Sequence, residues 1–76
     1  MDELREGLYD LSTRLNEAIE QARRVGYLAR RLGLSQVDEQ LENDVLPQLV
    51  AFADDSRTAT QPGSVGQLLA LLEEEA

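Results

Sequence analysis

The first 32 residues carry a heptad pattern that constrains the fold more than any other feature of the chain. Apolar residues recur there at alternating steps of four and three: Leu4, Leu8, Leu11, Leu15, Ala18, Ala22, Val25, Ala29 and Leu32. This spacing places them in the a and d positions of one long amphipathic helix. Leucine dominates the first half and alanine the second, so the stripe narrows along the helix. The pattern predicts an all-α fold built on this helix.

The end of the first helix has a clear signal. Gly33 follows the last residue of the stripe and is typical of a left-handed C′ position. Leu34 is expected to fold back against Ala29, and Ser35 to cap the next helix. A connection of about three residues makes two helices antiparallel neighbours. We therefore expect residues 1–57 to form an antiparallel helical hairpin.

The second helix is expected over residues 36–56, with Pro47 inside it. Proline removes a backbone hydrogen bond and favours a kink. Alternatively the helix restarts there with Asp44 as its N-cap, which would put Pro47 in a first turn. One face of this helix carries Val37, Leu41, Val45, Leu49 and Phe52. The apolar pattern widens after the proline, so this helix needs a cover on two sides.

A polar loop is predicted at 58–63 and a short amphipathic helix at 64–76. Ser64 can cap this helix, and Gln67 three residues later completes a capping-box pattern. Val65, Leu68, Leu69 and Leu72 then share one helical face. Two interpretations stay open. The helix covers the start of the first helix, or its apolar face binds a partner.

Size favours association of two copies. A chain of 76 residues buries a small core and is marginally stable alone. It contains no cysteine for a disulfide, and with neither cysteine nor histidine a zinc site is not expected. The apolar stripe of the first helix, which we call the heptad seam, and the two apolar sides of the second helix hold more apolar surface than one hairpin can bury. We expect a homodimer, in the form of a four-helix bundle. Its predicted dimer or core residues are Leu4, Leu8, Leu11, Leu15, Ala18, Ala22, Val25, Leu41, Val45, Leu49 and Phe52.

Charge is unevenly distributed. Residues 1–33 hold six acidic residues and six arginines, whereas residues 34–76 hold nine acidic residues and one arginine, so the second part carries the whole net charge of −8. Such a surface repels phosphate backbones and argues against nucleic-acid binding. The arginines of the first helix surround an aromatic residue and are a second candidate for binding a partner: Arg23, Arg24, Tyr27, Arg30 and Arg31.

The sequence offers no catalytic constellation. Histidine and cysteine are absent, and the serines lack a partner base. We therefore expect no enzymatic activity, no cofactor and no metal. The N-terminal residues do not resemble a signal peptide and no apolar run is long enough for a bilayer, so we expect a cytoplasmic protein that binds no membrane.

These features indicate a non-enzymatic protein-interaction module, such as a small adaptor, docking domain or regulator, whose partner the sequence does not identify. An alternative is a small acidic inhibitor, of bacterial or phage origin, that blocks a basic site on its target. A third is a co-chaperone of the secretion type.

Overall fold

A computed structural model describes residues 2–75, and in this range every regular element is helical. Helix α1 spans Asp2–Arg31, α2 spans Ser35–Gln40, the π-helical turn η1 spans Leu41–Val45, α3 spans Leu46–Ala53 and α4 spans Val65–Glu75. The prediction of an all-α fold is confirmed.

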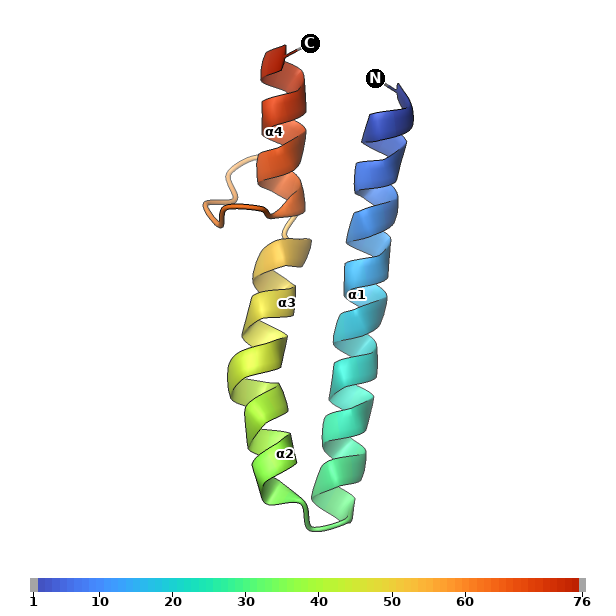
Figure 1. Ribbon diagram of the computed structural model, residues 1–76, viewed down its shortest axis with the longest axis vertical. Coiled ribbons are helices and arrows are strands. Elements are labelled where there is room, and N and C mark those ends of the chain that lie inside the picture. Colours follow the sequence, from blue (N-terminus) through green and yellow to red (C-terminus); the bar gives the residue numbers. More distant parts are fainter. Residues whose placement is uncertain (1, 76) are drawn as a thin grey trace.

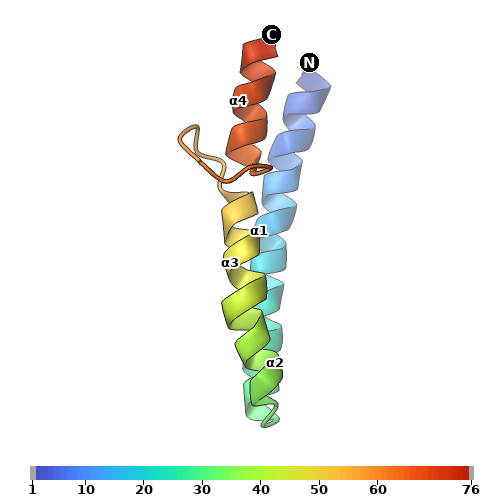
Figure 2. The same cartoon turned by 60° about the vertical axis from the view of Figure 1, so that its left-hand side comes forward.

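The elements after α1 return along one of its sides. Helix α2, η1 and α3 follow one another beside α1, and α4 continues beyond α3, beside the N-terminal part of α1 (Figures 1 and 2). The molecule measures 51 × 21 × 12 Å along its principal axes. One α-helix with its side chains is about 10–12 Å in diameter. The protein is therefore a slab one helix thick and two helices wide.

The end of α1 has the geometry that its sequence predicts. Gly33 has φ of +77°, in the left-handed region that glycine favours. The Gly33 N–H donates to the carbonyl of Arg30 at 3.1 Å, and the Leu34 N–H donates to the carbonyl of Ala29 at 2.8 Å. These two hydrogen bonds form a Schellman motif. The predicted cap at Ser35 is wrong, because the turn is so tight that Ser35 is already the first residue of α2 and its side chain caps nothing.

The second helix does not restart at Asp44, but Pro47 does lie in a first turn, and the predicted kink stays a prediction. The chain stays helical through Val45, so Asp44 does not act as an N-cap, and the Leu46 N–H donates to the carbonyl of Leu41, five residues back. This wider turn precedes Pro47, which then lies in the first turn of α3. Because Pro47 has no N–H and its ring crowds the carbonyl four residues earlier, an inserted residue relieves the clash. The helix ends at Ala53, three residues before the predicted end, since Asp54 is extended.

The segment 54–64 is held closely against α4. The Gly66 N–H donates to the carbonyl of Asp54 at 2.9 Å, and the Gln67 side chain donates to the carbonyl of Ala59. The hydroxyl of Ser64 accepts the Gln67 N–H at 3.3 Å, so the predicted cap is confirmed. The reciprocal half of the capping box is replaced by the bond to Ala59. The loop is therefore anchored at several points rather than free.

Most of the deeply buried residues lie at this end of the slab. Val65 is fully buried, and Leu69 and Leu72 are 2% and 4% exposed. Farther along α1 the contacts with α2 and α3 bury smaller side chains, such as Ala22 and Ala29. The core is therefore thickest around α4 and thin along the rest of the slab.

Replacing Gly7 with alanine should stabilise the protein by about 0.5–1 kcal/mol. Gly7 lies inside α1, where glycine costs backbone entropy, and an added Cβ would meet no atom within 4 Å. Urea denaturation of both proteins measures the change. A lower free energy of unfolding for Gly7→Ala would show that this glycine is required at a close contact.

Candidate functional site: an exposed apolar column

Two columns of α1 residues, each spaced by seven, face the returning helices. The first, Leu8, Leu15, Ala22 and Ala29, belongs to the predicted heptad seam, and its members are half-buried or buried. The second, Ser12, Ile19 and Gly26, is buried but lies outside that seam. Hydrophobicity alone missed the second column because it contains serine and glycine. The small residues Ser12 and Gly26 were the signal in the sequence, because small side chains let two helices approach closely. The approach is close at Gly26, where an added Cβ would lie 3.3 Å from a carboxylate oxygen of Asp38.

The remaining column of the predicted seam is left at the surface. Leu4 is 54% exposed, Leu11 41%, Val25 39% and Leu32 74%, and Ala18 between them is half-buried. We call these five residues the apolar column. They follow α1 from its first turn to the residue after its end, beside its contact strip, and Leu4 and Leu32 at the two ends are the most exposed of them. Whether they join a dimer seam stays a prediction.

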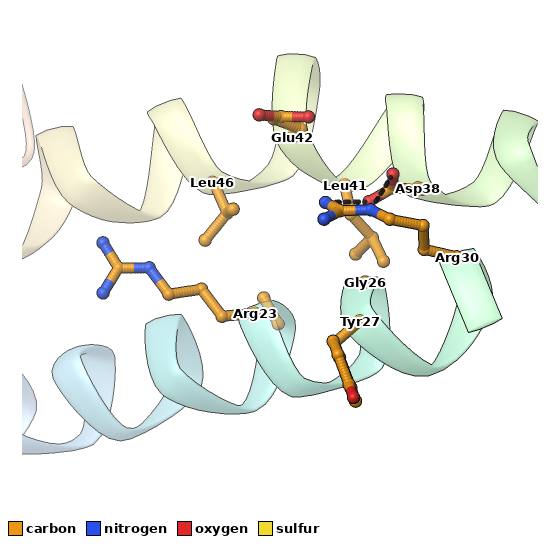
Figure 3. A pocket seen from close by; sticks show the side chains of 9 residues that line it. Arg23, Gly26, Tyr27, Arg30, Asp38, Leu41, Glu42 and Leu46 are labelled. Carbon is orange, nitrogen blue, oxygen red and sulfur yellow. Dashed lines mark hydrogen bonds and ion pairs between the residues drawn. The ribbon is translucent and has the colours of Figure 1, made fainter.

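The opposite side of the slab carries charged residues around a groove, together with the exposed Val50, which lines a cavity beside Arg23. A groove of about 280 Å³ lies between α1 and the segment α2–η1–α3, and Figure 3 shows Arg23, Arg30, Asp38 and Glu42 around it. The Arg30 Nε donates to Asp38 Oδ2 at 3.1 Å, and Nη2 donates to Oδ1 at 3.4 Å. The hydrogen bonds to Asp38, together with its negative charge, raise the pKa of Arg30 above its usual value. This ion pair joins α1 to α2 at the polar face.

Exposed valines of the second helix lie on the same side as the apolar column. Asp38 and Leu46 line the polar groove. Val37 immediately precedes Asp38, and Val45 immediately precedes Leu46. One residue step rotates a side chain by about 100° around the helix axis, so both valines are turned away from the polar groove toward the other side of the slab. They are 45% and 39% exposed. The predicted face residues Leu41, Leu49 and Phe52 are half-buried between the two sides.

In α4, Leu71 immediately precedes the buried Leu72 and is 51% exposed. Helix α4 runs in the same direction as α3 beside α1 (Figure 1).

The two predicted partner-binding groups are placed differently. Val65, Leu69 and Leu72 are buried and Leu68 is half-buried, so a partner reaches them only if α4 leaves α1. The arginine group is exposed, but its members make separate contacts. Arg30 pairs with Asp38, and the guanidinium of Arg31 lies 5.8 Å from the ring centre of Tyr27. Arg23 lines the polar groove, and Arg24 is exposed.

Comparison with known proteins gives no relative from which to infer a function. No protein-family model, curated protein or solved structure matches the chain. Within residues 2–75 no cluster of acidic side chains is arranged to hold a metal ion. None of the helices in that range is both long enough and apolar enough to span a membrane.

Proposed function

We propose that this chain is a non-enzymatic protein-interaction module, a small adaptor, docking or regulatory protein, and that it acts as a homodimer. Two helical hairpins pack by their apolar sides into a four-helix bundle. The observation that carries the proposal is a slab one helix thick with a continuous column of exposed apolar residues along one side.

The dimensions of the slab support this proposal. Stable domains bury the apolar faces of their helices between two packed layers, and a single layer leaves one face open to water. The 51 Å by 21 Å side has an area on the order of 1,000 Å². A standard protein interface needs about 800 Å² from each partner. A second copy would therefore supply the missing layer over an area of the usual size.

The polar side stays open in such a dimer and is our candidate surface for another protein. Tyr27 is 57% exposed there, next to the guanidinium of Arg31, and Arg23 and Glu42 border the groove. Tyrosine and arginine are the residue types that most often dominate binding energy in protein interfaces. A dimer would present two copies of this surface, one on each side of the bundle.

Replacing Leu11 with aspartate should weaken the dimer by at least about 100-fold in its dissociation constant. The change removes an apolar contact and places an unpaired charge in each half of the interface. Leu11 is already 41% exposed within one chain, so folding of the single chain should change little. Sedimentation equilibrium measures the dissociation constant, and circular dichroism reports the helix content.

Tyr27→Asp is the matched control, since it places the same charge at an exposed position of α1 outside the apolar column. It should leave the dissociation constant within about threefold of the unmodified protein, the range of surface substitutions. Equal association of the Leu11→Asp variant and the unmodified chain would contradict the proposal.

A further inference from the structure

A column of charged residues runs beside the apolar column on α1, and each of its members immediately precedes a member of the apolar column in the sequence. It consists of Glu3, Asp10, Glu17, Arg24 and Arg31, and we call it the charged column. All five are exposed. Its sign changes along the helix, from three acidic residues in the first half to two arginines in the second. A helix with this polarity is complementary to a copy of itself that runs in the opposite direction.

The spacing of the two columns fits such a reversal to within two residues. A two-fold axis beside Glu17 and Ala18 brings Leu11 opposite Val25 of the second copy, and Ala18 opposite its own counterpart. The same axis leaves Asp10 and Arg24 of the second copy, and likewise Glu3 and Arg31, two residues or about 3 Å along the helix from direct opposition, which their side chains can span. One register therefore pairs the apolar columns directly and brings the opposite charges of the two charged columns near each other. Glu17 meets its counterpart at the axis, with Arg14 about one turn away on each copy.

We propose that the two α1 helices of the dimer pack against each other antiparallel, centred on Ala18, with the charged columns side by side at the rim. This inference rests on the proposed function and specifies the geometry of that interface. Because the rim charges are exposed, each pair adds little affinity. Their effect is on orientation, since complementary charges suppress the wrong alignment.

In a parallel pairing the charged columns of the two copies would not meet each other. In a parallel pair, the residues on one flank of the interface in the first helix lie next to the residues on the opposite flank in the second helix. The charged column of each copy would then face the column of Leu8, Leu15 and Ala22, which carries no charge and already contacts the chain's own helices. Charge complementarity thus selects the antiparallel pairing.

Cross-linking tests the direction, and the chain suits it because it contains no cysteine. Two variants, Leu11→Cys and Val25→Cys, are prepared separately and treated with a short bis-maleimide, alone and mixed. The antiparallel register predicts that the mixture cross-links at least about 10-fold more than either variant alone, because only the mixed pair has a high effective concentration of the two thiols. Ala18→Cys, at the axis, should cross-link with itself.

The outcomes separate this inference from the proposed function. If Leu11→Cys cross-links with itself as well as it does with Val25→Cys, the helices are parallel and the inference is wrong, while the dimer stands. If sedimentation shows a dimer but Ala18→Cys does not cross-link, α1 does not pair with α1 and the inference is again wrong. If every variant and the unmodified chain are monomeric, the proposed function fails together with the inference.

Discussion

Replacing Gly66 with alanine is expected to lower the free energy of unfolding by about 3 kcal/mol, the upper end for overpacking a buried site. A Cβ on Gly66 would clash with the carbonyl oxygen of Ser56 and lie 3.1 Å from Cβ of Ala59. The first of these atoms is backbone, which cannot turn away as a flexible side chain can. The segment 54–64 would have to move, and the hydrogen bond from Gly66 to Asp54 would be strained or lost.

Urea denaturation followed by circular dichroism measures this loss. The matched control is Gly7→Ala, the same substitution in α1 where the added Cβ is free of contacts. Hydrogen exchange adds a local measure, since amides of α4 should lose protection before those of α1. Equal stabilities for Gly66→Ala and the unmodified protein would mean that segment 54–64 is not packed against α4.

The second large effect is expected for Leu69→Ala, which should lower the free energy of unfolding by about 2–5 kcal/mol. Leu69 is 2% exposed and lies between the fully buried Val65 and the buried Leu72 on the face of α4 that covers α1. Truncation removes buried methyl groups and leaves a cavity. In a chain of this size such a loss is a large fraction of the whole stability.

Val50→Ala provides the comparison for Leu69→Ala. Val50 is 50% exposed on α3, so its truncation should change the free energy of unfolding by less than about 0.5 kcal/mol. Thermal and urea unfolding of both variants give the two values. If Leu69→Ala were as stable as Val50→Ala, α4 would not belong to the core and would be free to bind a partner by its apolar face.

Features that depend on neighbouring residues could be predicted from the sequence. The course of α1 follows from its heptad spacing, and its end follows from Gly33, whose left-handed conformation needs only glycine and two backbone hydrogen bonds. The cap at Ser64 likewise depends only on a residue within one helical turn, Gln67. These signals act within one helical turn, so a single sequence carries them completely.

Features that depend on packing between elements were predicted only in part. The heptad seam contains one of the two columns that α1 turns toward its own chain. The other column includes Ser12 and Gly26, which a search for apolar residues passes over. The π-helical turn before Pro47 arises because a clash with proline can be relieved by an added residue as well as by a kink. Sequence spacing does not decide between these solutions.

The candidate site shows the same limit. The apolar residues of α4 are predicted from the sequence either to join the core or to bind a partner, and those of the apolar column belong to the predicted heptad seam. The structure separates them, since Leu69 is buried by its own chain whereas Leu4 and Leu32 are exposed. Burial of α4 depends on the anchored segment 54–64, whose contacts with Gly66 and Gln67 are not encoded in a repeating pattern.

The central claim is that the apolar side of the slab is covered by a second copy of the chain. Sedimentation equilibrium of the unmodified protein, at tens of micromolar and moderate salt, tests it most directly because it measures mass without reference to shape. We expect a species of twice the mass of one chain, which dissociates on dilution. A fully folded protein that has the mass of a single chain at every concentration would contradict it.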